Sequence, residues 1–463
     1  MKKTDLRVIA LIFLCFLFSR EVFSTEIQSL PRLTISDCVR RGTSENLSLA
    51  VKKLSKEESF QDIQISRKIF IPEVSVNTSR DEKNRLKIEN RFSRKSDSGT
   101  RYGVKLSDAD IFRNSTSEDQ SYTFQLSRPV LRNFGRQING LDIDISGLDY
   151  SIAEESFKSD LNSLAFNIVK AWLNLFFAAK NLEIQESAYR MALKQYEETK
   201  NDIGKGVLPE QDIFLVEENV VRFDVKREDA KRNISIYQNE LGRLLNYDIA
   251  SFPGIIASDS LTAEIELVSS FSISLENLQK FNPTIKMKQY ALKKSLLNFD
   301  YYKNQLLPVL NFNIDYSLNR RNDSAFETGY AVGFDFSAPL SRKSDRAQVT
   351  KAKIGVKRSE ISIEEIESNL EWELKDVYVD LNYLFKLLEA KKKVRALAQQ
   401  KLEAQEEKYR NGISTLDEVV RFQRDLENSK IDEISVLISF NRVRYEILFL
   451  EGNLYKYFGI LFE

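Results

Sequence analysis

The chain has 463 residues, of which only 16 are glycine and 8 are proline, so long uninterrupted elements are favoured over many small ones. Its 68 basic and 68 acidic residues cancel, which argues against a nucleic-acid partner, because such a partner requires a basic surface. Histidine is absent, and with it the commonest general base and the commonest metal ligand. We therefore predict a protein that is not an enzyme and that holds neither a metal nor a cofactor.

The N-terminal residues 1–24 have the pattern of a secretory signal peptide. Basic residues come first, an apolar run follows at Val8–Phe18, and the small residue Ser24 precedes the expected cleavage site. The alternative, a transmembrane anchor, is disfavoured because this run is too short to cross about 30 Å of hydrocarbon. Cys15 lies inside the apolar run, which disfavours a lipoprotein. We expect an exported mature chain that keeps only Cys38 and therefore has no internal disulfide.

Residues 25–271 are predicted to form a first structural repeat, which begins with a helix. The polar helical stretch at 44–71 stops at Pro72, because proline cannot continue a helix. Farther along, a long helical hairpin is predicted at about 139–246, and a linker at 247–271 closes the repeat. Its first helix has about 66 residues without proline and would extend roughly 100 Å, far beyond a globular helix.

A β segment at about 72–130 lies between these helices. Its two ends alternate apolar and polar residues, at 74–78 and at 122–126. The insert between them, 79–120, is expected mostly on the external face. Two short apolar patterns within the insert are candidate additional strand pieces, Leu86-Lys87-Ile88 and Tyr102-Gly103-Val104.

Residues 272–463 are predicted to form a second repeat with the same order of elements. A helical stretch at 275–307 stops at Pro308, a β segment follows at about 308–339, and a second long hairpin follows at about 345–459. The β segment alternates cleanly over the length that a tilted strand needs to cross a bilayer. Its apolar positions are Leu310, Phe312, Ile314, Tyr316, Leu318, Tyr330, Val332, Phe334 and Phe336.

The same alternation would also fit an ordinary β-sandwich with half-buried strands, but the signal peptide and the adjoining long helices favour membrane strands. The most apolar later stretch, 164–179, is interrupted by Asn167, Lys170 and Asn174. No helical membrane span is therefore expected after the signal peptide. If the exported chain crosses a membrane, it must do so with a β-barrel.

The two halves overlay on each other, which predicts an internal two-fold repeat. Asn46–Pro72 aligns with Asn282–Pro308 without a gap, and Trp172–Gly206 aligns with Tyr378–Gly412. Gly206 and Gly412 are predicted helix C-caps. In the second long helix the apolar residues are spaced by threes, fours and sevens, as a coiled-coil seam requires; they include Ile354, Ile361, Leu370, Leu374, Val377, Leu381, Leu384 and Leu388.

Together these features resemble the TolC family of outer-membrane efflux and export channel proteins. The resemblance covers nearly the whole mature chain and includes Asn282-Pro283 with the helix after it, the segment 305–308, and the segment 127–136. It implies a mainly α fold with β structure, in which a long α-helical coiled-coil barrel joins a transmembrane β-barrel. Each of three protomers would contribute four strands to one 12-stranded barrel.

The resemblance also implies a functional site at the two hairpin turns. In the family these turns form the periplasmic tip, where an adaptor protein docks; the corresponding residues here are Gly206, Val207, Leu208, Gly412, Ile413 and Ser414. The residues that correspond to the family's periplasmic gate are Asp212, Tyr409, Asp417 and Glu418.

Within this gate, Asp212 and Tyr409 correspond to a hydrogen-bonded pair, and a phenol that donates to a carboxylate is chemically suited to opening and closing. Glu418 falls where an acidic ring narrows the entrance. Alternatively, Asp212 is a carboxylate favoured by the helix dipole and Tyr409 a packed coiled-coil aromatic. Ser414 and Arg421 depart from the family. In the family, an arginine can occupy the position of Ser414, and a second acidic residue of the entrance can occupy the position of Arg421.

The function implied is an outer-membrane channel of a tripartite efflux or type I secretion system, which conducts substrates passively from a tunnel through the periplasm to the exterior. Its expected partners are two further copies in a homotrimer, a periplasmic adaptor (membrane fusion) protein, an inner-membrane pump and outer-membrane lipid. An alternative is an exported coiled-coil adaptor or structural protein without a channel, although adaptors normally carry a single hairpin. An exported hydrolase would need a cluster of catalytic groups that no part of the sequence indicates.

Overall fold

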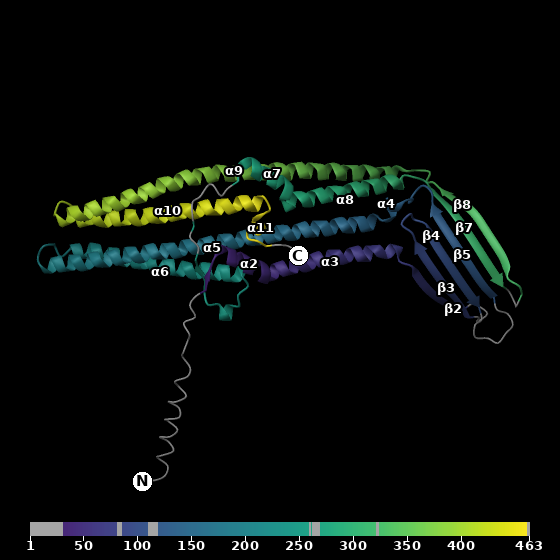
Figure 1. Ribbon diagram of the computed structural model, residues 1–463, viewed down its shortest axis with the longest axis horizontal. Helices are drawn as coiled ribbons and strands as arrows, with labels where there is room; N and C mark the ends of the chain where they lie inside the picture. The colour runs from purple at the N-terminus through teal and green to yellow at the C-terminus, as the bar shows by residue number, and fades with distance from the viewer. Residues whose placement is uncertain are drawn as a thin grey trace, which may run out of the picture. The chain divides into compact units, whose positions relative to one another are not determined.

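The computed structural model describes residues 31–80, 86–109, 119–258, 261, 269–320 and 324–460, so the predicted signal peptide lies outside the described residues. The chain divides into two compact units (element labels in Figure 1). Unit 1 comprises Met1–Glu45, Asn167–Ala263 and Leu384–Arg442, and unit 2 comprises Asn46–Phe166, Glu264–Tyr383 and Val443–Glu463.

Two antiparallel helical hairpins dominate unit 1. The first joins the end of α5 (Leu141–Gly204) to α6 (Asp212–Leu244), and the second joins the end of α9 (Lys343–Arg410) to α10 (Leu416–Leu450). The predicted very long helices are thus confirmed, with 64 residues in α5 and 68 in α9. The longest apolar window of α5 has the length and composition of a membrane span, but two thirds of it is buried inside the protein, as expected of a core helix.

Both long helices end at the predicted glycines. Gly206 and Gly412 have φ angles of 73° and 70°, a left-handed conformation that only glycine adopts without strain. Val207 N donates to Asp202 O at 2.9 Å, and Ile413 N donates to Lys408 O at 2.9 Å. These bonds are typical of Schellman caps, which satisfy the last helical carbonyl groups and reverse the chain.

Short elements of unit 1 lie at the end of the hairpins that is opposite to the turns. They are α2 (Ile35–Glu45), the 3-10 helix η2 (Ile249–Ser251) and a parallel pair formed by β1 (Arg32–Leu33) and β6 (Ile256–Ala257). The indole Nε1 of the fully buried Trp172 donates to Leu33 O at 3.0 Å, which ties this pair to α5. The sequence analysis made no prediction for α2, and it missed β1 and β6 because strands of two residues carry no periodicity.

The remaining helices belong to unit 2: α3 (Leu47–Ser66), η1 (Arg67–Phe70), α4 (Arg136–Asn139), α7 (Phe271–Phe281), α8 (Pro283–Gln305) and α11 (Leu454–Tyr457). The stretch predicted as one helix at 275–307 is two helices. The break is at Asn282, whose side chain accepts from Thr284 N and caps α8. Asn46, its counterpart in the sequence overlay, caps α3 by accepting from Leu49 N. Such caps satisfy backbone N–H groups that a helix start leaves without partners.

Four helices of unit 2 form a layer in the order α3, α5, α8, α9. Helix α3 contacts α5 through Lys52 and Asp160, whose charged atoms lie 3.3 Å apart. Helix α5 contacts α8 through Asp149 and Lys294, and α8 contacts α9 through a hydroxyl pair, Ser295 and Ser359, at 3.0 Å. The layer therefore has two outer helices, α3 and α9.

Unit 2 also contains one six-stranded antiparallel sheet. The strands are β2 (Glu73–Arg80), β3 (Leu86–Lys95), β4 (Arg101–Ala109), β5 (Asp119–Pro129), β7 (Val309–Arg320) and β8 (Glu327–Ser337), and they lie in this order (Figure 1). Strands β2 and β8 are the edges. The edge strand β2 follows the outer helix α3, and the edge strand β8 precedes the outer helix α9. The edges of the sheet and the outer helices of the layer therefore lie on the same two sides.

The insert is the main departure from the prediction. The sequence led us to expect most of residues 79–120 on the external face, outside a set of four strands. Instead, β3 pairs with β2 over eight positions and β4 pairs with β5 over nine, so the insert forms a hairpin within the sheet. The described sheet has six strands where the resemblance implied four.

Candidate functional site

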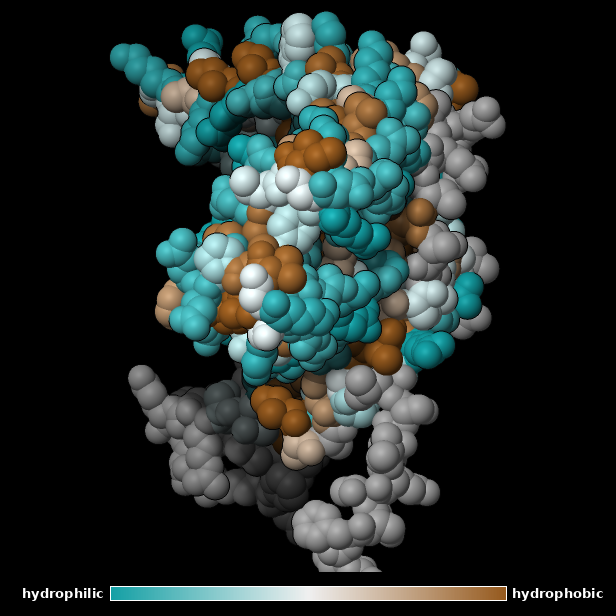
Figure 2. Space-filling model, turned by 90° about the vertical axis from the view of Figure 1, so that its left-hand side faces the viewer, coloured by the Kyte–Doolittle hydropathy of each residue, from teal (hydrophilic) through white to brown (hydrophobic). Residues whose placement is uncertain are grey.

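The two hairpin turns of unit 1 end in exposed apolar side chains. Val207 is 68% exposed, Ile413 is 76% exposed, and Phe214 in the first turn of α6 is 70% exposed. Figure 2 looks onto this end, where brown patches interrupt a mainly teal surface. Large apolar side chains on a turn surrounded by charge are typical of a surface that contacts another protein. Of the other predicted docking residues, Gly206 and Gly412 shape the turns, and Leu208 lies half-buried beside Val207.

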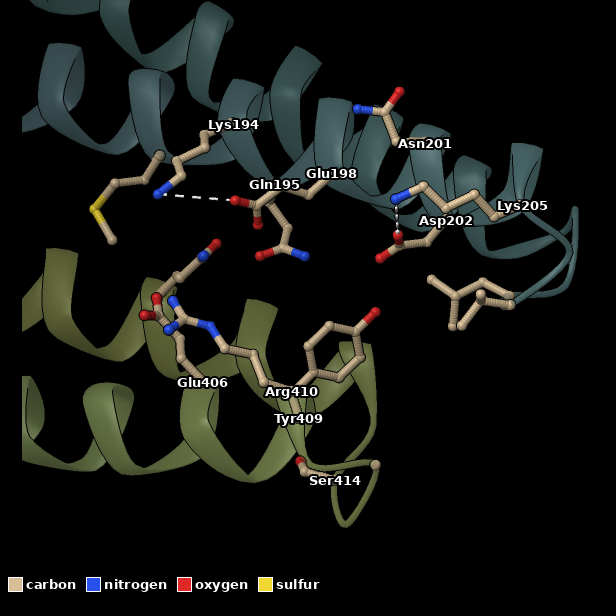
Figure 3. Close-up of a pocket in the computed structure, with 15 residues that line it drawn as sticks. Lys194, Gln195, Glu198, Asn201, Asp202, Lys205, Glu406, Tyr409, Arg410 and Ser414 are labelled. Carbon is tan, nitrogen blue, oxygen red and sulfur yellow. Dashed lines mark ion pairs between the residues drawn. The ribbon is translucent and has the colours of Figure 1, made fainter.

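A cavity of about 850 Å³ lies between the two hairpins near these turns. Charged residues of α5 line one wall, and the end of α9 lines the other (Figure 3). The α5 wall carries two ion pairs, Lys194–Glu198 at 3.8 Å and Lys205–Asp202 at 3.5 Å. Tyr409 projects from α9 into the space opposite them.

Tyr409 has an apolar side and an acidic side. Its ring packs against the buried cluster of Leu402, Val419 and Leu426. Burial and the nearby carboxylates of Asp202, Asp212 and Glu198 raise the pKa of the Tyr409 hydroxyl. The phenol therefore stays protonated and able to donate a hydrogen bond across the neutral pH range.

The predicted partner Asp212 lies near Tyr409, but within the described chain no hydrogen bond joins the two side chains. Asp212 begins α6, where a carboxylate is favoured by the helix dipole. The sequence missed Asp202 and Glu198, which face the same hydroxyl group. Their spacing of four residues was an available signal, because like charges at this spacing on a helix repel and favour a nearby partner.

Glu418 is held by polar side chains of its own hairpin. Ser414 Oγ donates to Glu418 Oε2 at 2.8 Å, and Gln405 Nε2 donates to the same oxygen at 2.7 Å. The Ser414 hydrogen bond lowers the pKa of Glu418, and Arg421 adds to the effect. Asp417 is exposed beside Glu418 in the first turn of α10. Ser414 and Arg421, the two departures from the family, thus both act on Glu418.

A buried polar layer joins the two hairpins farther from their turns than the cavity. The sequence did not predict this layer. Glu427 of α10 is 3% exposed. Gln185 Nε2 of α5 donates to it at 2.8 Å, and Lys226 Nζ of α6 donates to both carboxylate oxygens, at 2.8 and 2.6 Å. A buried carboxylate is tolerated only with such partners, so this layer fixes how the two hairpins align.

The sheet of unit 2 has one apolar and one polar face. Residues that lie directly opposite each other on neighbouring strands share a face. One row across all six strands reads Val74, Phe92, Val104, Phe124, Tyr316 and Tyr330. The row beside it, on the other face, reads Ser75, Arg91, Lys105, Thr123, Ser317 and Gly329.

Large side chains on the apolar face are exposed in the part of unit 2 that the structure describes. On β8, Tyr330 is 84% exposed and Phe336 is 68% exposed, and on β2 Val74 is 69% exposed. A row of exposed aromatic and branched side chains is unfavourable in water, but it suits contact with lipid.

Among the described residues, no group of three or more acidic, cysteine or histidine side chains is arranged to hold a metal ion.

Comparison with known proteins gave matches to solved structures. No family model and no curated protein matches the sequence. The outer-membrane protein VceC from Vibrio cholerae has a TM-score of 0.70 and 12% identity, and the match covers 90% of this chain and 96% of that one. For the CmeC outer-membrane channel of Campylobacter jejuni the values are 0.64 and 14%, over 90% and 85% of the two chains.

A third structure, the open state of the MtrE outer-membrane channel of Neisseria gonorrhoeae, matches with a TM-score of 0.66 and 15% identity, over 91% of this chain and 89% of that one. This chain has the fold of an outer-membrane channel protomer. The resemblance to the TolC family is thereby confirmed at the level of the fold. The apolar sheet face and the hairpin tips are exposed surfaces of this fold that bear on its function.

Proposed function

We propose that the chain is one protomer of a homotrimeric outer-membrane channel that exports substrates passively within a tripartite efflux or type I secretion system. The observation that carries the proposal is the exposed apolar face that runs across all six strands. A bilayer covers such a face, and the polar face then lines a lumen. The mainly helical fold with its sheet, shared with the outer-membrane channels, agrees with this assignment.

The two edge strands of the described sheet support assembly from several copies. Backbone N–H and C=O groups in lipid must be paired, so a membrane sheet must close on itself. The edge strands β2 and β8 run antiparallel to each other in the strand order, so β8 of one copy can pair with β2 of the next and keep the alternation. The number of copies in the assembly, three, comes from the family resemblance.

The outer helices of the layer carry exposed apolar stripes that closure would cover. On α3 the stripe includes Leu47, Val51 and Leu54, which are 60–68% exposed. On α9 it includes Ile354 and Ile361, which are 62% and 51% exposed. Spacings of three, four and seven residues place each stripe on one helix face, as in coiled coils. The same neighbouring copies would thus complete both the barrel and the helical tunnel.

The hairpin tips would receive the periplasmic adaptor, through which an inner-membrane pump supplies energy. The exposed side chains of Val207, Phe214 and Ile413 suit such a contact. Tyr409 and the carboxylates around it would form the gate above the tip. We assign no chemistry to the chain itself, because conduction requires no catalytic group.

Cell fractionation tests this proposal. The full-length protein, expressed with its leader, is expected in the outer-membrane fraction as a trimer that resists dissociation by SDS until heated. The measurement is electrophoresis of heated and unheated fractions, with mass determination in mild detergent. A monomer recovered entirely from the cytoplasm would contradict the proposal.

A further inference from the structure

The turn of the β3–β4 hairpin packs against the segment that leads from the sheet into the helices. This turn, residues 96–100, is closed by a hydrogen bond from Ser96 N to Thr100 O at 2.7 Å. Gly99 in this turn has a φ of 90°, and a Cβ there would lie 2.6 Å from the side chain of Asn139 and 2.7 Å from Asn133 O. Gly135 N donates to Ser98 O at 3.1 Å. The turn is therefore fixed against the connection between β5 and α4.

The hairpin also has the length and the two faces of its neighbours. Strand β3 has 10 residues and β4 has 9, against 8 in β2 and 11 in β5. Phe92 and Val104 continue the apolar row between Val74 and Phe124. Since β4 pairs with the edge of β5, strand β2 is joined to the other described strands through this hairpin alone. If the sheet spans the membrane, these two strands span it as well.

The polar face of the hairpin differs in charge from the rest of the sheet. Its described residues include four cations, Arg91, Lys95, Arg101 and Lys105, and one anion, Glu89. At the polar-face positions of β2, β5, β7 and β8, the described side chains include four anions and no cation; the anions are Glu73, Asp315, Glu327 and Asp335. Glu89 pairs with Lys105 at 3.0 Å and with Arg91 at 3.6 Å, and Arg91 remains 50% exposed.

We propose that the β3–β4 hairpin is part of the membrane wall, so that three copies form an 18-stranded pore whose lumen carries three basic sectors that attract anionic groups of the cargo. The inference rests on the proposed channel function. Six strands from each copy give a wider pore than the four that the family resemblance implied, and barrels of 16–18 strands enclose an aqueous channel. Without the hairpin, the polar face would carry acidic charges alone.

Spin labels test where the hairpin lies. In a Cys38→Ala background, single variants Phe92→Cys, Val104→Cys and Lys105→Cys are labelled in the trimer reconstituted in lipid vesicles. Labels at Phe92 and Val104 are expected to be accessible to oxygen dissolved in the bilayer and protected from a water-soluble nickel chelate, and the label at Lys105 is expected to show the reverse. The matched control is Phe124→Cys, in the same row on β5.

The control separates failure of the inference from failure of the proposed function. If Phe124 is in contact with lipid but Phe92 and Val104 are reached by the nickel chelate, the hairpin lies outside the membrane and the inference is overturned. If the Phe124 label is also water-accessible, the sheet does not span a bilayer, and the channel proposal fails with it.

Ion selectivity tests the basic sectors. Replacing all four cations by glutamine (Arg91→Gln, Lys95→Gln, Arg101→Gln, Lys105→Gln) is expected to raise the cation-to-anion permeability ratio by about twofold or more, because fixed charges that line a pore set its selectivity. The ratio is measured from reversal potentials across planar bilayers in a salt gradient. The matched control, Asp315→Asn with Asp335→Asn, is expected to shift the ratio in the opposite direction. An unchanged ratio in the glutamine variant overturns the proposed basic sectors.

Discussion

The surroundings of Tyr409 are compatible with both alternatives that the sequence presented, a packed aromatic and a gate residue. Its ring packs against Leu402 and Val419, while its hydroxyl faces the carboxylates of Asp202, Asp212 and Glu198. A hydroxyl beside several carboxylates can donate to any one of them after a small shift of the side chain, because a phenol and a carboxylate form a charge-assisted hydrogen bond. The apolar contact anchors the side chain, and the acidic side gives it more than one partner.

The gate assignment predicts that the double variant Tyr409→Phe with Asp212→Ala has a higher resting conductance in planar bilayers than the unchanged protein. The phenylalanine keeps the packing but cannot donate a hydrogen bond to the carboxylates, so under this assignment the tip closes less tightly. Tyr196→Phe, which removes a hydroxyl from the α5–α6 hairpin that also carries Asp212, is the control and is expected to leave conductance unchanged. Unaltered conductance in the double variant would count against the gate.

Glu451 offers a prediction about pH. Its side chain is 3% exposed and accepts from Asn277 Nδ2 at 3.2 Å, and burial raises the pKa of the carboxyl group. The folded protein therefore binds a proton more tightly than the unfolded chain. The stability that this proton contributes is complete below the unfolded pKa and is lost as pH rises through the folded pKa.

We expect Glu451→Gln to raise the unfolding temperature at neutral pH by a few degrees, because glutamine keeps the acceptor oxygen without the buried charge. The advantage should shrink as pH is lowered toward the unfolded pKa of glutamate. Circular dichroism of thermal unfolding over a pH series measures it. An equal difference between the two proteins at every pH would refute the argument.

At the scale of elements, the alignment of the two hairpins depends on the buried carboxylate of Glu427 and its two partners. The ammonium group of Lys226 is closer to Glu427 than the amide of Gln185, with contacts of 2.6 and 2.8 Å. Because the Lys226 side chain is 38% exposed, water screens part of the attraction.

We predict that Lys226→Met destabilises the protein by about 1–2 kcal/mol, since it leaves a buried carboxylate without its counter-ion. Adding Glu427→Gln should restore part of the loss, because the amide needs no counter-ion. Lys231→Met, which breaks an exposed ion pair with Glu228 on the same helix, is the control and should have little effect. The unfolding temperature of each variant in detergent is the measurement, and equal effects at the two lysines would contradict the prediction.

Elements with a strong local pattern were predictable from the sequence. The long helices lack proline, and Gly206 and Gly412 end them through left-handed caps, which depend on neighbouring residues only. Strand β3 was missed as a full strand because Asn90 and Arg94 occupy positions on its apolar face and obscure the alternation. These two polar residues become part of the strand through pairing with β2 and β4, which the pattern of β3 alone does not encode.

The candidate site was predictable only in part for the same reason. The turns and the acidic first turns of α6 and α10 are local features of the sequence. The grouping of Asp202 and Glu198 around Tyr409, and the contact of Gln185 with Glu427, join residues more than 200 positions apart in the chain. These contacts depend on how one hairpin packs against the other.

At the scale of the whole molecule, the described part of an isolated chain leaves the apolar face of the sheet and the stripes on α3 and α9 exposed, in addition to the hairpin tips. Lipid can cover the first, but the stripes flank charged helix surfaces and suit protein contact instead. Because the edge strands lie on the same two sides as these helices, one neighbouring copy would cover a stripe and pair an edge together. Assembly of the helices and closure of the sheet should therefore be coupled.

Coupling predicts that a charge placed in the α3 stripe weakens the barrel as well as the tunnel. Leu54→Glu is expected to convert most of the SDS-resistant trimer to monomer, since a carboxylate buried at an interface without a partner is strongly unfavourable. Lys53→Glu, which adds the same group one residue earlier outside the stripe, should leave the trimer intact. Semi-native electrophoresis of unheated outer membranes reports both species. If Leu54→Glu remains a fully SDS-resistant trimer, the stripe on α3 does not contact a neighbouring copy, and the helices and the sheet close independently.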